Sequence, residues 1–180
     1  MSSRPRSHPI RMVVTLSLMS ACAGPVAAQS VVRETDGWGG TVESIDLGLF
    51  ALSDGGDGRV LGGTLVRRTR PGGERDILLV LWYGGNDNAG ILEDAPLEVL
   101  LDQEQLRAPI FGPVSRGRDA DGLVMETTAY RFSPDQLRRV GRAAAVRLHV
   151  IAVGAGLQCT LQADNLRQWQ AFVAEVVGAH

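Results

Sequence analysis

The chain has 180 residues, 44% of them hydrophobic and 21% charged, which is the composition of an ordinary globular protein. It carries 18 basic and 20 acidic side chains, and every basic one is arginine. Once the leader described below is removed, 15 arginines remain against 20 acidic residues, a net charge of −5. This acidity argues against a nucleic-acid partner, which needs a basic face.

The first 28 residues have the pattern of a bacterial signal peptide. Arg4, Arg6 and Arg11 give a positive start, and Met12–Ala23 is an apolar stretch shorter than the roughly 20 residues of a membrane-spanning helix. Small residues at 26–28 follow a Gly-Pro break, which predicts cleavage before Gln29. We therefore expect an exported protein of the periplasm or outer envelope, with no transmembrane span in the mature chain.

Two alternatives to this cleavage stay open. Met19–Cys22 resembles the lipobox of bacterial lipoproteins, in which the cysteine carries lipid, although Leu18 stands one place earlier than that pattern prefers. An uncleaved apolar N-terminal helix is the other alternative. Cleavage before Gln29 would remove Cys22 and leave Cys159 as the one cysteine, so that no disulfide could form within the mature chain.

Residues 29–37 are polar and lack a pattern, which predicts a short tether before a single domain over residues 38–180. Strand-like runs then alternate with turns rich in Gly, Asp and Asn, and such short turns favour antiparallel hairpins. The expected strands are 41–46, 48–53, 60–69, 76–83, 97–102, 106–111 and 123–132. A further hairpin of 146–153 and 157–161 is expected to turn through 154–156.

The run Ile77–Tyr83 is apolar throughout, which predicts a central strand covered on both faces. We expect two helices to cover its second face. The first begins at Ser133, where Ser133 and Gln136 have the spacing of a capping box. The second begins near Asp164 and ends at Gly178; its apolar stripe is Leu166, Trp169, Val173, Val176 and Val177, flanked by Phe172. The predicted fold class is α+β, a mainly antiparallel β-sheet body with two amphipathic helices in the C-terminal third.

Cys159 and His149 form the most interesting candidate pair. If the hairpin turns through 154–156, Cys159 lies opposite Ile151, and His149 shares its sheet face on a diagonal. A Cys–His pair can generate a reactive thiolate, and carboxylates in or beside strands (Glu43, Asp46, Glu98, Asp102, Glu126) could serve acid–base chemistry. A change of register by one residue would separate Cys159 from His149, and a lone strand cysteine is usually a buried hydrophobic residue.

Three loop clusters, 54–58, 86–88 and 119–122, contain the carboxylates and amides that calcium prefers, although hairpin turns have the same composition. Arg67, Arg68 and Arg70 form one basic cluster, and Arg138, Arg139 and Arg142 form another. Either cluster could bind an anionic lipid headgroup or a wall polymer, and solvated charge is the simpler interpretation. Trp38, Trp82 and Trp169 could line a groove; packing in the core is the simpler interpretation for Trp82 and Trp169.

Signature motifs of hydrolases, nucleotide-binding loops and zinc sites are missing from the sequence, and we assign no catalytic, cofactor or metal residues. The leading hypothesis is a non-enzymatic binding or accessory module of the cell envelope, whose partner is an envelope protein, a lipid or a wall component. One alternative is a small envelope hydrolase that uses strand carboxylates or the Cys159/His149 pair. The other is a calcium-stabilised envelope module.

Overall fold

The computed structural model describes residues 31–36, 39–55 and 58–178. The expected leader, with Cys22 and the cleavage point before Gln29, lies outside these residues, as does Trp38. These residues form eleven strands, β1 to β11. One helix lies between β9 and β10, and a second follows β11 and continues into a short π-helix. The α+β, mainly antiparallel fold predicted from the sequence is confirmed.

Six strands form the larger sheet, sheet A, in the order β1-β2-β4-β5-β9-β8. All neighbours in it are antiparallel. Its strands are β1 (Val32–Thr35), β2 (Thr41–Leu49), β4 (Val60–Thr69), β5 (Arg75–Gly85), β8 (Ser115–Arg118) and β9 (Val124–Arg131). β1 occupies part of the segment predicted as a tether, and β8 was not expected from its polar sequence SRGR.

Five shorter strands form sheet B, in the order β3-β11-β10-β6-β7. They are β3 (Ala51–Leu52), β6 (Leu97–Leu101), β7 (Glu104–Ala108), β10 (Val146–Val150) and β11 (Leu157–Thr160). In β6 and β10, buried and partly or fully exposed residues alternate. This is the pattern of a sheet that packs on a core with one face and meets water with the other.

β5 is a central strand, as its uninterrupted apolar sequence predicted, because it lies between β4 and β9. Ile77, Leu79, Leu81 and Tyr83 join the main core, which also contains the buried side chains of sheet B and of the helices. Leu78 and Val80 belong to a second apolar cluster on the other face, with Val66, and with Val42, Phe111 and Ala129 packed against it. The expectation that helices cover this second face was wrong.

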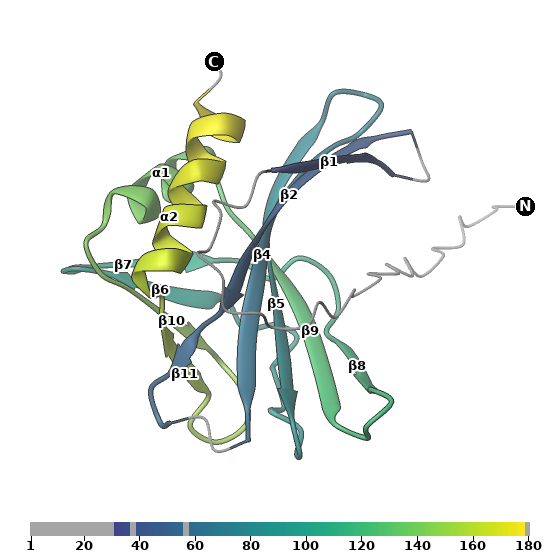
Figure 1. Cartoon of the computed structure of the whole chain (residues 1–180), viewed down its shortest axis with the longest axis vertical. Coiled ribbons are helices and arrows are strands. Elements are labelled where there is room, and N and C mark those ends of the chain that lie inside the picture. The colour runs from purple at the N-terminus through teal and green to yellow at the C-terminus, as the bar shows by residue number, and fades with distance from the viewer. Residues whose placement is uncertain (1–30, 37–38, 56–57, 179–180) are drawn as a thin grey trace, which may run out of the picture.

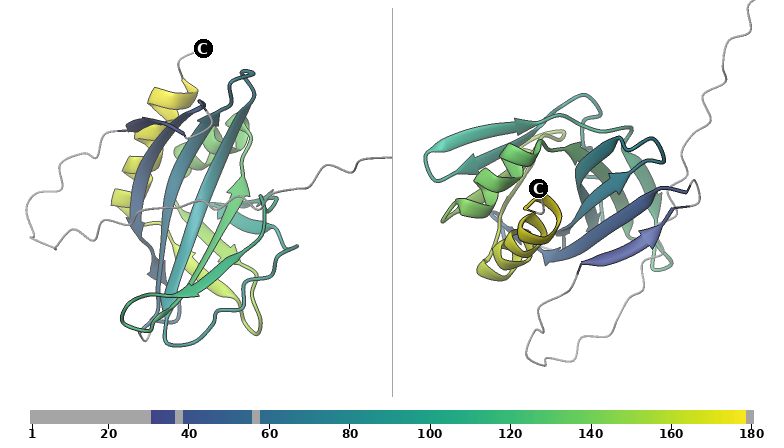
Figure 2. Two further views of the ribbon diagram at one scale, coloured as in Figure 1. Left: turned by 90° about the vertical axis from the view of Figure 1, so that its right-hand side faces the viewer. Right: turned by 90° about the horizontal axis from the view of Figure 1, so that it is seen from above.

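Both helices instead pack against the main core (Figures 1 and 2). The first, α1 (Pro134–Arg142), begins with the predicted capping box between Ser133 and Gln136, and it buries Leu137 and Val140. The second, α2 (Ala163–Phe172), continues as the π-helix η1 (Val173–Val177) and buries Trp169, Phe172, Val176 and Val177. Seen from above, the helices lie at the side that the two sheets leave open, so the core is enclosed by sheet A, sheet B and the helix pair (Figure 2).

The side chain of Asn165 joins α2 to sheet A, because it bonds the edge of β2 where a neighbouring strand would otherwise pair. β1 pairs only with residues 41–44 of β2, so the rest of β2 has an open edge on that side. The amide nitrogen of Asn165 donates to the carbonyls of Leu47 (2.6 Å) and Leu49 (3.1 Å), which point away from β4. Asn165 is buried, and it satisfies two carbonyls at the edge of β2. An open edge would expose these carbonyls to pairing with a strand of another chain.

Candidate functional site

The predicted pair of Cys159 and His149 does not form. Cys159 lies opposite Leu148, whereas His149 lies opposite Gln158, so the two side chains point to opposite faces of sheet B. The loop between β10 and β11 spans residues 151–156 and is longer than the expected turn, which shifts the register. Cys159 is fully buried, and this burial raises the pKa of its thiol to about 12. The predicted pairing of Cys159 with His149 is therefore wrong.

Thiol labelling checks this placement of Cys159. In the folded chain at pH 8, we expect 5,5′-dithiobis(2-nitrobenzoate) to react with Cys159 about 1,000-fold more slowly than in urea. A thiol pKa of about 12 leaves very little reactive thiolate at this pH, and burial also blocks access of the reagent. His149→Ala should leave the folded rate unchanged. If His149→Ala lowered the labelling rate of Cys159 in the folded chain, the hypothesis of a Cys–His pair would be supported again.

His149 belongs instead to a polar cluster on the outer face of sheet B. Its Nδ1 lies 3.1 Å from a carboxylate oxygen of Glu98, and Arg107 donates to the other oxygen at 3.2 Å. The hydrogen bond with His149 is the main cause that lowers the pKa of Glu98. His149 therefore acts as a surface partner of Glu98, on the opposite face of sheet B from Cys159.

The strand carboxylates proposed for acid–base chemistry are not gathered at one place. Glu126 is fully buried and accepts hydrogen bonds from the backbone N–H groups of Gly90 and Ile91, at 2.9 and 3.0 Å. Glu43 lies at the other end of the same sheet face, about 20 Å away at 3.3 Å per residue along β5. Asp102 caps the backbone of Ala144 and Ala145. Each of these carboxylates supports local structure.

The loop carboxylates considered for calcium are also used within the protein. Asp54 pairs with Arg59, and Asp119 accepts the backbone N–H groups of Asp121 and Leu123 within its own turn. Among residues 31–36, 39–55 and 58–178, no three His, Cys, Asp or Glu side chains form a group able to hold a metal. Residues 56 and 57 of the first cluster lie outside the described part.

The two described tryptophans differ in their surroundings. Trp169 is fully buried, as expected, and its indole N–H donates to the carbonyl of Leu137 at 3.2 Å. Trp82 is only partly buried and lies on the outer face of sheet A, so its predicted place in the main core was wrong. Its ring covers Gly62, where a Cβ atom would come within 2.3 Å of it, so only glycine fits beneath.

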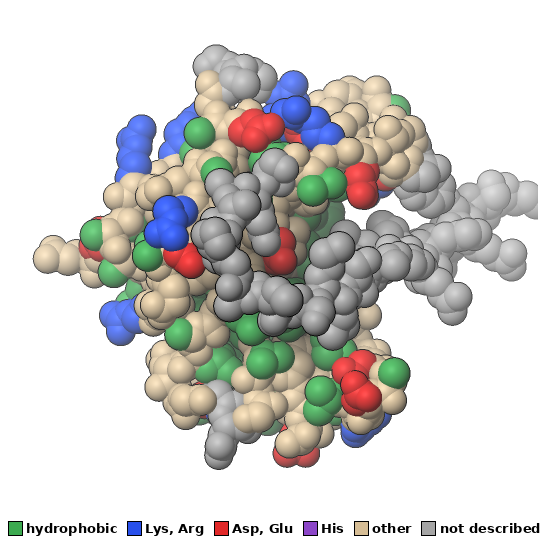
Figure 3. Space-filling model, in the orientation of Figure 1, with side chains coloured by type: hydrophobic (Ala, Val, Ile, Leu, Met, Phe, Trp, Pro, Cys, Tyr) green, Lys and Arg blue, Asp and Glu red, His purple; other side chains and the backbone are tan. Residues whose placement is uncertain are grey.

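One arginine from each of the two predicted basic clusters, Arg67 and Arg138, lines the same pocket. Arg67 lies near the end of β4, Arg75 begins β5, Arg131 ends β9, and Arg138 lies on α1. All four line a cavity of about 180 Å³ between the end of sheet A and the helices; we call it the arginine pocket. Its remaining lining is Asp76, Ile77, Phe132, Pro134, Val176 and Val177. On the face seen in Figure 3, blue arginine side chains gather mainly at the end that carries the helices and β1.

The floor of the arginine pocket is apolar, and its rim is positively charged. Ile77, Phe132, Val176 and Val177 are all buried. Asp76 is the one acidic residue among the lining residues, and it is buried between Arg70 (2.9 Å) and Arg131 (3.1 Å). Asp76 thus fixes the position of Arg131. The guanidinium carbon of Arg131 lies 4.6 Å from the ring centre of Phe111, so its charged end is on the outer face of sheet A, beside Leu78.

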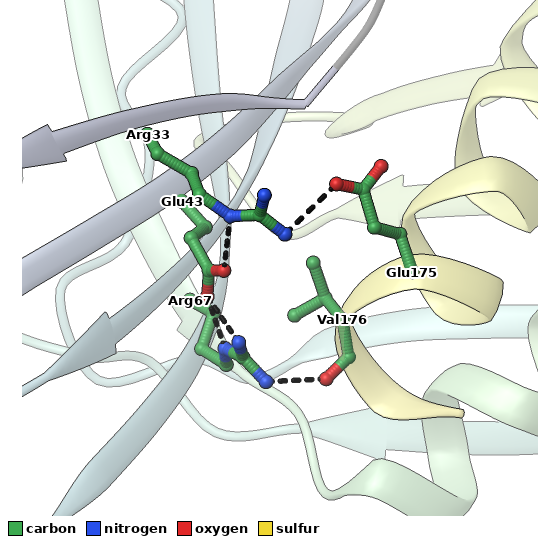
Figure 4. Close-up of polar contacts among 5 residues, drawn as sticks. All are labelled: Arg33, Glu43, Arg67, Glu175 and Val176. Atoms are coloured by element: carbon green, nitrogen blue, oxygen red, sulfur yellow. Dashed lines mark hydrogen bonds and ion pairs between the residues drawn. The ribbon is translucent and has the colours of Figure 1, made fainter. Parts of the chain in front are cut away.

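Arg67 is held by a buried carboxylate and by the C-terminal helix (Figure 4). Glu43 on the neighbouring strand accepts hydrogen bonds from Arg67 and from Arg33, and Arg67 also donates to the carbonyl of Val176. Arg33 reaches Glu175 in η1 at 2.9 Å. Burial alone would raise the pKa of Glu43, but the hydrogen bonds and charges of Arg33 and Arg67 lower it below its usual range. Glu43 is therefore ionised at neutral pH and orients Arg67 at the pocket.

Comparison with protein-family models, curated proteins and solved structures gives no match. What the arginine pocket binds must then be inferred from its own geometry and charge. None of the helices in the described ranges is long and apolar enough to cross a membrane.

Arg75 and Arg131, the other two pocket arginines, were not singled out from the sequence. Each stands at the end of a strand, Arg75 before the apolar run of β5 and Arg131 after the alternating sequence of β9. Only the hairpin of β4 and β5 and the pairing of β9 with β5 bring them beside Arg67. Predicting such a site from the sequence would have required knowledge of the strand order.

Proposed function

We propose that this protein is an exported, non-enzymatic binding module that takes a small organic anion, with a carboxylate-type head and a short apolar group, into the arginine pocket. Four arginine residues line a pocket whose floor consists of buried aliphatic and aromatic side chains, and this juxtaposition carries the proposal. Export is supported by the leader-like pattern of residues 1–28. The function needs no nucleophile or metal.

Guanidinium groups suit this ligand because each has five N–H donors in a planar fork that matches a carboxylate or phosphate. Arg67, Arg131 and Arg138 use part of this capacity on Glu43, Asp76 and Asp135. These partners hold the arginines in place before a ligand arrives, which lowers the entropy cost of binding. Such a pocket favours an anion over a neutral ligand of the same shape.

The volume of the arginine pocket limits the apolar part of the ligand. About 180 Å³ is below the roughly 300–1,000 Å³ of typical small-molecule sites. A short acyl chain or the terminal portion of a larger amphiphile can fill it, with the charged head at the arginine rim. Lipid and wall components of the envelope include anions of this kind, which agrees with the partner class expected from the sequence.

Isothermal titration with sodium octanoate tests the proposed ligand class. We expect saturable binding of octanoate, and no measurable binding of acetate or 1-octanol, because the first lacks the chain and the second lacks the charge. Arg138→Gln should weaken octanoate binding about tenfold, the loss of one charge-assisted hydrogen bond. Arg138 suits this test because, among the acidic residues that the structure describes, it forms an ion pair only with the exposed Asp135.

Arg142→Gln is the matched control, because Arg142 lies on the same helix and outside the pocket lining. We expect it to bind octanoate within twofold of the unmodified protein. Equal losses in both variants would mean that general positive charge attracts octanoate. Equal binding of octanoate and 1-octanol would contradict the role of the arginines.

A further inference from the structure

Exposed apolar side chains gather at one end of the molecule, opposite the arginine pocket (Figure 1). β4 begins at this end and β5 finishes there, because Val60 pairs with Gly84; we call it the loop end. Six large hydrophobic side chains are exposed in the described part of the chain, and five of them lie at or near the loop end: Leu49, Val60, Leu92, Leu123 and Val153. Single exposed side chains are ordinary, but their concentration at one end indicates an interaction surface.

Negative charge accompanies these apolar side chains. Asp87, Asp94 and Asp121 are exposed in the loops of this end, and none of them forms an ion pair with another residue that the structure describes. Arg59, which lies nearby, is already paired with Asp54. On the face drawn in Figure 3, acidic and hydrophobic side chains lie next to one another at this end. A partner for the loop end must therefore offer positive charge together with an apolar surface.

The turn between β8 and β9 (residues 119–123) presents both features on one fixed tip. Asp119 accepts the backbone N–H groups of Asp121 and Leu123, at 3.0 and 2.9 Å, and Arg118 donates to the carbonyl of Gly122 at 2.6 Å. Leu123 is 37% exposed, and Asp121 is exposed as well. Because the turn is already held in shape, a partner that binds it pays little conformational entropy.

This turn carries the combination that the arginine pocket requires, a carboxylate beside a short apolar group. The pocket volume of about 180 Å³ suits one aliphatic side chain, since a cavity of roughly 150 Å³ already holds a benzene molecule. The turn cannot reach the pocket of its own chain. β5 runs from Arg75 at the pocket to Gly85, which pairs with Val124 directly after the turn, and this separation is about 33 Å at 3.3 Å per residue. Only a second molecule can bring the two together.

We propose that the chain binds a second copy of itself head to tail, with the β8–β9 turn of one molecule in the arginine pocket of the next. This inference rests on the proposed function, because it names the partner of that same pocket. The carboxylate of Asp121 pairs with arginines at the rim, and the side chain of Leu123 lies on the apolar floor. Each pair still offers a turn at one end and a pocket at the other, so the contact does not close and short open chains form.

The contact is small, so the assembly is weak and reversible. Stable interfaces bury roughly 800 Å² per partner, and a single turn in a pocket of about 180 Å³ covers less. We expect a dissociation constant on the order of 100 μM, as in transient interfaces. Added salt should weaken the contact further, because the carboxylate on the turn is exposed to solvent.

Sedimentation velocity of the protein between about 10 μM and 1 mM tests this proposal. We expect the average mass to rise with concentration, and millimolar octanoate to return it to that of a monomer, because octanoate occupies the same pocket. Asp121→Arg should weaken association at least about tenfold, since it places a positive charge against the arginines. Glu34→Arg is the matched control: it changes the net charge equally on exposed β1, outside the turn and the pocket lining, and should associate within about twofold of the unmodified protein.

Mixing two variants distinguishes a head-to-tail contact from a symmetric one. Arg138→Glu damages the pocket and keeps the turn, whereas Leu123→Asn damages the turn and keeps the pocket. Each variant alone should stay a monomer at about 100 μM, with an unchanged circular dichroism spectrum. Together they should form a one-to-one complex that grows no further, because only one intact turn and one intact pocket are present in each pair.

Three results would overturn the proposal: a monomer mass at every concentration, unchanged association of Asp121→Arg, or failure of the mixed variants to form a complex. A monomer whose Leu123 signals shift on vesicles of phosphatidylcholine would assign the turn to a lipid surface instead. Octanoate binding by a protein that stays monomeric would overturn this inference alone and leave the proposed function intact. Absence of octanoate binding would refute the proposed function itself.

Discussion

Replacing Trp169 by alanine should lower the free energy of unfolding by about 3–5 kcal/mol, the range for large aromatic residues in cores. Trp169 is fully buried, and its ring packs edge-on against Phe132 with the ring centres 5.7 Å apart. Its indole N–H also holds the carbonyl of Leu137, so it joins α2 to α1. The substitution would leave a cavity, and it would remove the indole's hydrogen bond to α1 at the point where both helices close the core.

Trp82→Ala is the matched control for Trp169→Ala. Trp82 lies on the outer face of sheet A against Gly62, and it is only partly buried. We expect its removal to cost less than half of the loss caused by Trp169→Ala. Urea unfolding followed by far-ultraviolet circular dichroism measures both variants without relying on tryptophan fluorescence. Similar losses for the two variants would contradict the position of the helices on the main core.

Glu43→Gln should also destabilise the fold, with a loss of about 2–3 kcal/mol in unfolding free energy, the range for a buried polar group left without its partner. Glu43 is 5% exposed, and the side chain of Arg67 beside it is 18% exposed. Removing the carboxylate charge leaves a largely buried guanidinium without its counter-charge, which is more costly than losing a surface pair. The same substitution weakens the tie between sheet A and η1.

Glu98→Gln provides the comparison for Glu43→Gln, because Glu98 also has a lowered pKa and two basic partners. Arg107 is 68% exposed, so this surface pair should contribute less than about 1 kcal/mol. Urea unfolding at neutral pH compares the two variants. Losses of equal size would contradict the structural importance of the buried carboxylate.

The acid side of the stability profile gives an independent check on Glu43. Its pKa is lower in the folded chain than in the unfolded one, so its stabilising effect is present above the ordinary value of 4.5 and is lost as pH falls through the lower folded value. The unmodified protein should therefore lose stability more steeply below pH 4.5 than Glu43→Gln does. Parallel profiles would show that Glu43 is not preferentially ionised in the fold.

Local sequence signals predicted most elements correctly because those signals act within a few residues. The apolar run Ile77–Tyr83 predicted a central strand, and β4 has the predicted bounds of 60–69. Ser133 and Gln136 form the expected capping box. Such features depend on backbone geometry and burial close by in the chain, so no knowledge of distant partners is needed.

Long-range placement could not be predicted in the same way. The loop after β10 is longer than the expected turn, and the resulting shift moved Cys159 and His149 to opposite faces of sheet B. The outer face of β5 is covered by its own apolar cluster, so the helices were free to pack on the main core. β1 is polar in sequence, and it forms a strand because β2 offers it an edge.

The arginine pocket also depends on such long-range placement. Arg75 and Arg131 have no sequence feature that connects them to Arg67, and the hairpin and strand order bring the three together. Chemistry assembled from separate elements is visible only once the topology is known.

NMR of the arginine side chains during an octanoate titration tests the central proposal most directly. The account predicts saturable shifts of the Nε–Hε signals of Arg67, Arg75 and Arg138, together with the methyl signals of Val176 and Val177. Arg107 and Arg147 in sheet B should not respond. Shifts that grow linearly without saturation, or that spread equally over all arginines, would show that the arginine pocket is not a binding site.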